Sequence, residues 1–370
     1  MNRDEGWIGL MSGTSLDGVD GVLATFSDGG VQVHAHAHAA FDAALRAELL
    51  ALNTPGPDEL HHAALAANAL VRVYAGVVAT LRAHAPGRPV RAIGAHGQTV
   101  RHRPGQFDGT GYTLQLNAPA LLAELTGLPV VADLRSRDLA AGGQAAPLVP
   151  AFHQACFGRA GEALPLANIG GIANLTLIDA DGTVRGFDCG PGNALMDGWC
   201  QRHRGEPYDA EGRWAAAGRV LAPLLAAALA DPYFALPPPK STGRDDFHAA
   251  WLDALVATHA PAADPRDVQS TLCDLTAQAI ARALQAHLPA AGRLLVCGGG
   301  ALNDELMRRL ACALPTIQVA STSTAGLPPL QVEAAAFAWL ARAHVHREPG
   351  NLPAVTGAVG PRVLGALYPA

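Results

Sequence analysis

The hydrophobic and polar positions of the first 40 residues alternate in blocks that predict a small sheet. Residues 7–11 and 19–26 are apolar, and the small polar residues 12–18 lie between them. After a turn at residues 28–30, residues 31–39 alternate with a period of two. Such blocks are typical of strands joined by a loop and a tight turn. We therefore expect three strands at the start of the chain.

Helical spacing follows in the next stretch. Apolar residues recur every three or four positions over residues 41–52 and 58–85, with Asp58 as a candidate cap. Residues 92–95 are apolar again and end in the polar loop 96–99. We expect two helices, followed by a buried strand that carries polar side chains at its end.

The same order returns in the second half of the chain. Residues 164–168 predict a strand, residues 169–174 a glycine turn, and residues 175–178 and 183–187 two further strands. Later segments predict a strand at 294–297 and helices at 194–204, 213–230, 268–288, 303–313 and 331–345. This repeat of element order predicts two related α/β domains with a cleft between them, where ligands are often bound.

Length and composition limit the class of protein. The 370 residues are 49% apolar and 16% charged, which suits two domains with sizeable cores. The net charge of -6 argues against a nucleic-acid partner. Residues 1–5 lack the apolar segment of a secretory signal, and the apolar stretch 220–230 is too short to cross a membrane. The six cysteines form no CxxC pair, which favours a cytoplasmic enzyme with reduced thiols over a disulfide framework or a zinc ribbon.

Three glycine-bearing turns stand at strand ends, at residues 12–18, 168–174 and 297–303. Glycine lets the backbone N–H groups approach a phosphate closely. One such turn is usually only a turn, but two of these three occupy matching positions of the repeat, which favours phosphate binding. The chain has neither a Walker A loop nor a GxGxxG fingerprint that opens a βαβ unit, so a dinucleotide oxidoreductase is disfavoured.

Lys240 is the one lysine of the chain, and the other 25 of the 26 basic residues are arginines. Residues 240–242 look like the end of a Walker A loop, but three prolines precede them where that loop needs a glycine-rich turn. A bias in codon composition is the plain interpretation of the scarcity of lysine. The retention of this single lysine suggests a constrained role.

Asp188 follows the apolar strand 183–187 and precedes the tight turn Gly190-Pro191-Gly192. A rigid, partly desolvated carboxylate at a strand end suits a general base. An Asx turn or a cap of the following helix accounts for the same position equally well. Both interpretations stay open at this point.

Other polar residues near strand ends are candidates for substrate binding. His96 and His102 flank a polar loop. Arg135 suits a carboxylate on a ligand, because its guanidinium donates two parallel hydrogen bonds. An ion pair of Arg135 with Asp133 or Asp138 is the alternative interpretation.

Two groups that invite a chemical role are better explained structurally. His34, His36 and His38 lie on one face of a strand, but no nearby carboxylate or cysteine completes a metal site, so we interpret them as a solvated face. Cys189 has no histidine patterned as its partner, so we interpret it as a small packing residue.

Several short motifs follow one another in a specific order. They are residues 11–20, 96–99, 168–174, 188–193 and 240–244, and then 356–358 with 360–362. In content and order they are very similar to the anhydro-N-acetylmuramic acid kinase family, and the resemblance covers nearly the whole chain. That family belongs to the actin, hexokinase and Hsp70-like superfamily. The resemblance therefore implies two RNase H-like α/β domains that close over ATP, formed by residues 1–134 joined by 356–370, and by residues 135–355.

The resemblance also implies the site residues. Asp188 matches the catalytic aspartate of the family. The sugar would contact His96, Thr99, Arg135 and Glu333, with Arg135 at its lactyl carboxylate and Glu333 at a hydroxyl. ATP would contact the three glycine turns, at Gly13, Thr14, Ser15, Leu16, Asp17, Gly18, Val19, Asp20, Gly170, Gly171, Asn174, Gly298, Gly299, Gly300 and Asn303. The magnesium ligands stay unassigned.

The implied reaction opens the 1,6-anhydro bond of the sugar with water and transfers the γ-phosphoryl group of ATP to O6, with magnesium, in peptidoglycan recycling. Asp188 would deprotonate the water, and positioning would supply most of the catalysis. A cytoplasmic homodimer that binds the amino sugar and ATP, without nucleic acid or membrane, is expected. An ordinary sugar kinase of the same superfamily is the first alternative, and a nucleotide-dependent scaffold is the second.

The chain departs from the family pattern in two places. Where members often have Gly-Gly-Gln-Gly-Ala-Pro, this chain has Ala145-Ala146-Pro147 after Gln144. A Cβ there is expected to disturb a backbone that needs a positive φ. Cys189 stands where a threonine commonly follows the catalytic aspartate, so a hydroxyl hydrogen bond is expected to be weakened.

Overall fold

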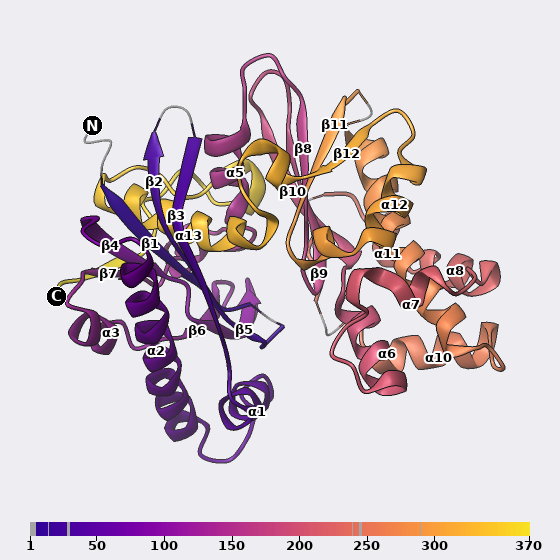
Figure 1. Cartoon of the computed structure of the whole chain (residues 1–370), viewed down its shortest axis with the longest axis horizontal. Helices are drawn as coiled ribbons and strands as arrows, with labels where there is room; N and C mark the ends of the chain where they lie inside the picture. Colours follow the sequence, from indigo (N-terminus) through magenta and orange to yellow (C-terminus); the bar gives the residue numbers. More distant parts are fainter. Residues whose placement is uncertain (1–4, 14, 28–29, 239, 244–245, 289) are drawn as a thin grey trace. The chain divides into compact units, whose positions relative to one another are not determined.

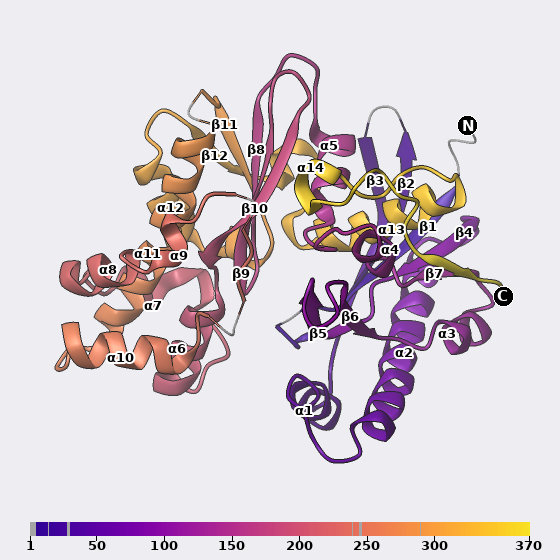
Figure 2. The same ribbon diagram turned by 180° about the vertical axis from the view of Figure 1, so that it is seen from behind.

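The computed structural model describes residues 5–13, 15–27, 30–238, 240–243, 246–288 and 290–370. The chain divides into two compact units. The first unit is Met1–Phe157 with Gln331–Ala370, and the second unit is Gly158–Leu330. Figures 1 and 2 show the chain from opposite sides, with the strands and helices of each unit labelled.

The sheet of the first unit has six strands. They are β1 (Gly6–Met11), β2 (Gly18–Ser27), β3 (Gly30–Ala40), β4 (Val90–Ala95), β7 (Val130–Ala132) and β13 (Ala366–Tyr368). Their order across the sheet is β13-β7-β4-β1-β2-β3. β1 is antiparallel to β2 and parallel to β4, and β4 is parallel to β7. A separate hairpin pairs β5 (Gln98–Pro104) with β6 (Gly111–Leu116).

Helices cover both faces of this sheet. α13 (Val332–Val345) lies directly on the backbone of β1 and β4, because Gly9 and Gly94 have no side chain there. A Cβ at these glycines would lie 1.8 and 2.0 Å from carbonyl oxygens of α13. Ile8, which points to the other face of β1, belongs to the core cluster that contains the buried side of α2 (Glu59–His84). The first unit is therefore a three-layer α/β/α structure.

Among the described residues, α2 is the one helix that is long and apolar enough to cross a membrane by length and composition. Its buried side includes Leu70, Val71, Val77 and Leu81, which pack in the core of the first unit. A core helix needs such an apolar side, so its composition has a structural explanation. At 26 residues, this helix is longer than the apolar stretch 220–230 that the sequence pattern indicated.

The remaining helices of the first unit are short. They are α1 (Ala43–Ala51), α3 (Pro119–Thr126), α4 (Ser136–Ala140), α5 (Val149–Phe157) and α14 (Pro353–Thr356). The predicted helices 41–52 and 58–85 correspond to α1 and α2. The hairpin β5–β6 and the helices α3 to α5 were not predicted.

The sheet of the second unit repeats the arrangement of the first. Its strands are β8 (Leu164–Ile169), β9 (Ile172–Ile178), β10 (Val184–Pro191), β11 (Arg293–Cys297) and β12 (Gln318–Ser321), in the order β10-β9-β8-β11-β12. β8 is antiparallel to β9 and parallel to β11, and β11 is parallel to β12. Position for position, this is the order and direction of β3-β2-β1-β4-β7. The predicted pair of related α/β domains is confirmed.

The core of the second unit is centred on α11 (Pro265–His287), whose Leu272, Ile280 and Leu284 are buried. Its other helices are α6 (Ala194–Arg204), α7 (Arg213–Ala216), α8 (Ala222–Leu229), α9 (Pro232–Ala235), α10 (Ala249–His259) and α12 (Asp304–Ala313). Short 3-10 turns are η1 (Ala210–Gly212), η2 (Gly299–Leu302), η3 (Thr322–Ala325) and η4 (Pro329–Gln331). The single helix predicted at 213–230 is two helices. α7 ends at Ala216, and α8 begins at Ala222 after the non-helical Leu221, with Pro223 in its first turn. α10 was not predicted.

The boundaries between the units differ from the expected ones. We expected a change of domain after residue 134 and a return at 356, but the units meet at 157/158 and 330/331. α13 packs on β1 and β4, and buried Asp138 is bonded to Asn351 and Thr356, so residues 135–157 and 331–355 belong with the first sheet.

Candidate active site

Asp188 lies near the end of β10, where a bulge separates it from Gly190. Its Oδ2 accepts a hydrogen bond from the backbone N–H of Thr242 at 3.0 Å, and its own N–H donates to Lys240 O at 3.1 Å. The hydroxyl of Tyr233 donates to Asp188 O at 2.7 Å. The side chain is therefore fixed through one carboxylate oxygen, and the backbone is fixed on both sides.

The electrostatic environment of Asp188 suits a base that works near neutral pH. Burial raises the pKa of this carboxyl to about 6, and the Thr242 hydrogen bond and the Lys240 charge oppose that rise. The alternative interpretation as a cap of the following helix is wrong, because Asn193 is the N-cap of α6.

The residue that follows Asp188 packs in the core. Cys189 is 1% exposed, and burial together with the Asp188 charge raises the pKa of its thiol. A thiol held in the neutral form is a poor nucleophile. The interpretation of Cys189 as a packing residue is confirmed.

The second and third glycine turns lie together beside this carboxylate. Gly192 and Asn193, which follow Asp188 in the chain, donate their N–H groups to Gly171 O and Gly170 O at 2.9 and 2.8 Å. On the other side, a Cβ at Gly300 would lie 2.4 Å from the side chain of Ile169. The second unit thus brings Asp188, Gly170, Gly171 and the turn at 298–300 into one cluster.

Two asparagines predicted to contact ATP have structural positions in this cluster. Asn303 is the N-cap of α12, and its Oδ1 accepts from the N–H of Leu306 at 3.0 Å. Asn174 pairs with Asp188 across β9 and β10. Gly298 has φ +78, a conformation that favours glycine, which explains this residue at the start of the third turn.

The first glycine turn, in the first unit, is braced by side chains. Ser12 is buried, and its hydroxyl donates to Gly97 O and lies 3.0 Å from the Tyr74 hydroxyl. Gln98 Nε2 donates to Gly13 O at 3.0 Å. Of the predicted ATP residues in this turn, Thr14 lies outside the described residues. Arg244 of the motif 240–244 and Pro239, one of the three prolines before that motif, also lie outside them.

The predicted residues after Thr14 differ in exposure. Leu16 and Val19 are buried in the core, so their side chains serve packing. Ser15 donates its hydroxyl to Asp17 Oδ1 at 2.7 Å, and Gly18 begins β2. Among the described residues of this turn, the backbone groups and the side chains of Ser15 and Asp17 are the polar groups suited to meet a ligand.

Asp20 contradicts part of the interpretation of the histidine face. Its Oδ1 lies 3.3 Å from His36 Nε2 and 3.2 Å from His38 Nδ1, whereas His34 is bonded to Thr25. A carboxylate is therefore near these histidines, although the sequence analysis expected none. Within the described residues, no group of three or more His, Cys, Asp or Glu side chains is arranged to hold a metal ion.

Arg135 and His96 lie in direct contact in the first unit. Arg135 Nε and Nη2 lie 3.1 and 3.0 Å from His96 Nε2, and Nη1 donates to Ala145 O at 2.6 Å. Burial lowers the pKa of Arg135 to about 10, while the charges of Glu333 and Asp138 oppose this shift. Burial and the Arg135 charge lower the pKa of His96 to about 3, so the imidazole is neutral and accepts from the guanidinium.

The other predicted sugar residues lie on neighbouring elements of the same unit. Thr99 Oγ1 accepts from Gln115 Nε2 at 3.2 Å, and Glu333 lies in the first turn of α13. His102 Nδ1 lies 3.0 Å from Thr113 Oγ1, and burial lowers its pKa to about 4. Within the described residues, the guanidinium of Arg135 is bonded to His96 and Ala145 and not to Asp133 or Asp138, so the alternative of a direct ion pair is not supported.

Asp138, which the sequence suggested only as an alternative ion partner of Arg135, supports this site through other contacts. It is fully buried, with Oδ1 accepting from Asn351 Nδ2 at 2.6 Å and from Thr356 Oγ1 at 2.7 Å. Its Oδ2 accepts from the N–H of Ala145 at 2.8 Å, the residue whose carbonyl binds Arg135. The motif at 356–358 was a signal for this link, but the sequence does not show what Thr356 contacts.

The departure at Ala145-Ala146 also becomes clear here. Ala145, not Ala146, has φ +57, which is left-handed backbone that favours glycine. The expectation of a positive φ in this segment is confirmed, and Ala145 is the residue that bears it.

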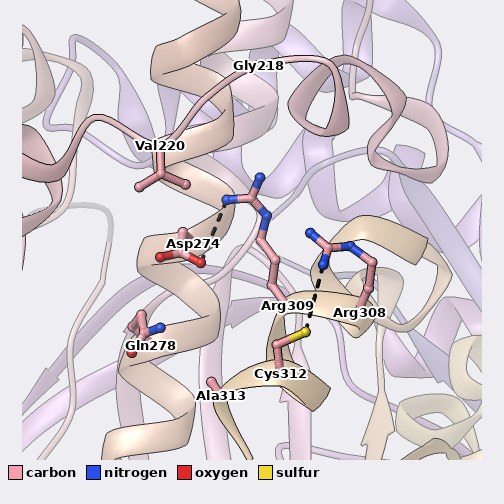
Figure 3. Close-up of a pocket in the computed structure, with 8 residues that line it drawn as sticks. All are labelled: Gly218, Val220, Asp274, Gln278, Arg308, Arg309, Cys312 and Ala313. Carbon is pink, nitrogen blue, oxygen red and sulfur yellow. Dashed lines mark hydrogen bonds and ion pairs between the residues drawn. The ribbon is translucent and has the colours of Figure 1, made fainter.

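The two described cavities lie elsewhere. One in the second unit has about 360 Å³ and is lined by residues of α11, α12 and the loop before α8. Figure 3 shows Arg309 reaching towards Asp274, at 3.7 Å, and Arg308 towards Cys312. The other, of about 380 Å³, lies beside Trp339 in the first unit. None of the residues lining either cavity is a predicted site residue.

Comparison with known proteins identifies the family. The family model described as anhydro-N-acetylmuramic acid kinase matches residues 5–370. A protein of that name from Variovorax paradoxus (strain S110) is 64% identical, covering 98% of this chain and 99% of the relative. One from Cupriavidus pinatubonensis is 60% identical over 98% of each. A solved activator of 2-hydroxyisocaproyl-CoA dehydratase from Clostridium difficile, with bound ADPNP, is 12% identical with a TM-score of 0.45, covering 89% of this chain and 91% of its own. This chain belongs to the anhydro-N-acetylmuramic acid kinase family.

Proposed function

We propose that this chain converts 1,6-anhydro-N-acetylmuramic acid, ATP and water to N-acetylmuramic acid 6-phosphate and ADP in peptidoglycan recycling. The observation that carries the proposal is the family match over residues 5–370, with relatives of that name up to 64% identical. Water attacks C1 of the sugar, and the C1–O6 bond breaks. O6 attacks the γ-phosphorus, and the bond to the β,γ-bridging oxygen of ATP breaks.

Asp188 is the general base of this reaction. Its Oδ2 is bonded to Thr242, which leaves Oδ1 to accept the proton of the attacking water. A pKa of about 6 keeps the carboxylate largely ionised at neutral pH while it retains enough basicity to take a proton. The rigid backbone around it holds the base in place, which matters because positioning supplies much of the rate in phosphoryl transfer.

ATP binds to the three glycine turns. Backbone N–H groups of Gly13, Ser15 and Gly18, with Gly170 and Gly171, face the phosphates, and the turn Gly298–Gly300 contacts the nucleoside. The remaining proposed contacts come from Thr14, Leu16, Asp17, Val19, Asp20, Asn174 and Asn303. Mg²⁺ accompanies ATP. A magnesium ion bound mainly by phosphates and water needs only one or two carboxylates, which fits a described chain without a three-ligand cluster.

The sugar is held by residues of the first unit. Arg135 binds the lactyl carboxylate, since its guanidinium is already oriented by His96 and Ala145. Neutral His96, Thr99 and Glu333 contact hydroxyl groups. We further propose that the enzyme is a cytoplasmic homodimer.

Product analysis tests the reaction. Incubation with the anhydro sugar, ATP and magnesium is expected to give a product heavier than the substrate by one water and one phosphoryl group. Run in ¹⁸O-water, the label is expected at C1 and absent from the phosphate ester. Phosphorylation of reducing sugars only, with the anhydro sugar untouched, would establish the ordinary sugar kinase instead.

A further inference from the structure

Lys240 makes close contacts with the chain around Tyr233. Its Nζ donates to Tyr233 O at 3.2 Å and to Phe234 O at 3.4 Å, and it lies 4.6 Å from the centre of the Tyr233 ring. Two carbonyl oxygens and an aromatic face together provide a favourable place for an ammonium group.

The same residues enclose Asp188. Tyr233 donates its hydroxyl to Asp188 O, Lys240 O accepts from the N–H of Asp188, and the N–H of Thr242 donates to Asp188 Oδ2. We call Tyr233, Lys240 and Thr242 the Lys240 clamp. Each member touches Asp188, and the Lys240 ammonium joins the Tyr233 side of the clamp to the Thr242 side.

We propose that Lys240 is a positioning residue for Asp188. The ammonium holds Tyr233 and the segment that bears Thr242 together, so that one carboxylate oxygen is bound and the other stays available. Its positive charge also stabilises the ionised carboxylate. The inference rests on the proposed function, in which Asp188 is the base.

The effect of the Lys240 charge on the pKa of Asp188 can be measured, because the neighbouring titratable groups are few. On its own strand, Cys189 is kept neutral by burial, and Tyr233 of α9 is kept neutral by burial and by the Asp188 charge. Asp246 accepts a hydrogen bond from the Thr242 hydroxyl at 2.6 Å. It therefore contacts Thr242, and no direct contact with Asp188 is described. Within the described residues, the hydrogen bond from the Thr242 N–H and the charge of Lys240 both lower the pKa of Asp188. Loss of that charge therefore raises the pKa of the base.

The charge of Lys240 also acts on a second titratable group, His287. His287 packs against Phe187 with ring centres 5.0 Å apart, and the charge of Lys240 contributes to the lowered pKa of this imidazole. A test of the Lys240–Asp188 coupling must therefore separate Asp188 from His287.

The single lysine makes a direct measurement available. Reductive methylation with ¹³C-formaldehyde labels Lys240 and the α-amino group only, since the sequence has no other lysine. We expect the NMR signal of dimethylated Lys240 to shift with a midpoint near pH 6, as Asp188 ionises. This pH-dependent step in the chemical shift is expected to vanish in Asp188→Asn and to persist in the control His287→Gln. Persistence of the step in Asp188→Asn would overturn the inference.

A second measurement uses activity. In Lys240→Met, the acidic limb of the kcat/KM profile is expected to move up by about one pH unit, because an opposite charge nearby lowers a carboxyl pKa by that order. Lys240→Arg keeps the charge and is expected to keep the limb where it is. An unmoved limb in Lys240→Met, with Asp188→Asn inactive, would refute the inference. Full activity of Asp188→Asn would instead refute the proposed base, while the NMR step would still report the contact.

Discussion

The first turn of each sheet occupies the same place in the same strand order, yet the two turns are held differently. In the first unit, the turn between β1 and β2 is braced by side chains, since Ser12 donates to Gly97 O and Gln98 donates to Gly13 O. The brace runs to the loop that begins with His96, the partner of Arg135.

In the second unit, the turn between β8 and β9 is braced mainly by backbone groups, with one side-chain bond from Asn193 Nδ2 to Ile169 O at 3.2 Å. Gly192 and Asn193 donate their N–H groups to the carbonyls of Gly171 and Gly170. This brace runs to the turn that follows Asp188. The hydrogen bonds of each turn thus lead to the proposed functional residue of the same unit, which is Arg135 in the first unit and Asp188 in the second. A side-chain brace is broken by truncation, whereas a backbone brace is broken by adding a Cβ.

The largest effect is expected at Asp188 in the second unit. Asp188→Asn is expected to lower kcat about 100- to 10,000-fold, because the general base is lost, while ATP affinity is retained. Steady-state kinetics and nucleotide titration measure the two. The control Asp181→Asn changes an exposed acid in the turn before β10 and is expected to keep the wild-type kcat. An active Asp188→Asn enzyme would move the chemistry away from the second unit.

Arg135 gives the corresponding test in the first unit. Arg135→Ala is expected to lower kcat/KM for the sugar about 10- to 100-fold, mainly through KM, because one charge-assisted contact is lost. Arg135→Lys keeps the charge but not the planar fork, so it is expected to recover only part of the loss. An unchanged KM in Arg135→Ala would show that the first unit does not anchor the carboxylate.

The two braces themselves can be compared by stability. In Gly192→Ala, the new Cβ would lie 2.3 Å from Gly170 O, and the unfolding free energy is expected to fall by about 1–3 kcal/mol. Ser12→Ala removes one buried hydroxyl and is expected to lower it by about 1 kcal/mol. The matched control is Gly198→Ala on α6, whose Cβ would meet nothing within 4 Å and favours the helix. Urea unfolding measures all three, and equal losses at Gly192 and Gly198 would contradict the backbone brace.

The smallest effect is expected at Ala145. Ala145→Gly relieves a left-handed alanine, which costs about 1–2 kcal/mol, but it also makes the unfolded chain more flexible. A net stabilisation of about 0.5 kcal/mol is expected in urea unfolding, with the Arg135 contact to residue 145 retained. A clear destabilisation would show that the Ala145 Cβ contributes packing that outweighs the strain.

Much of this fold is visible in the sequence. Apolar runs, period-two alternation and helical spacing identify β1 to β4, β8 to β11, α1, α2, α6, α11, α12 and α13, because each combines an apolar pattern with a turn signal at its end. α3 and α4 are short, with 8 and 5 residues. α5 and α10 are as long as α1 and α12, but α10 buries only Leu252 and so has no apolar repeat to detect. The sequence also does not show which of the two units α13 belongs to. Its apolar residues show that it is buried, but only the bare backbones of Gly9 and Gly94 show against what.

The candidate site divides in the same way. Asp188 and the glycine turns stand out because strand ends and glycines are local signals. The contact of Arg135 with His96 joins residues 39 positions apart, and that of Asp138 with Thr356 joins residues 218 apart. Such pairs follow from sheet topology, so the chain alone names the residues without naming their partners. Lys240 is intermediate, since its rarity marked it while its contacts came from the structure.

The packing of α13 on Gly9 and Gly94 has a consequence for the order in which the two units can fold during synthesis. The second unit is continuous in the chain, whereas the first unit needs residues 331–370 to cover one face of β1 and β4 and to add β13. On the ribosome, where synthesis runs from the N-terminus, the second unit is therefore fully available for folding before the first is. Residues 1–157 are synthesised first, but the unit to which they belong can complete its fold only after residues 331–370 have been synthesised.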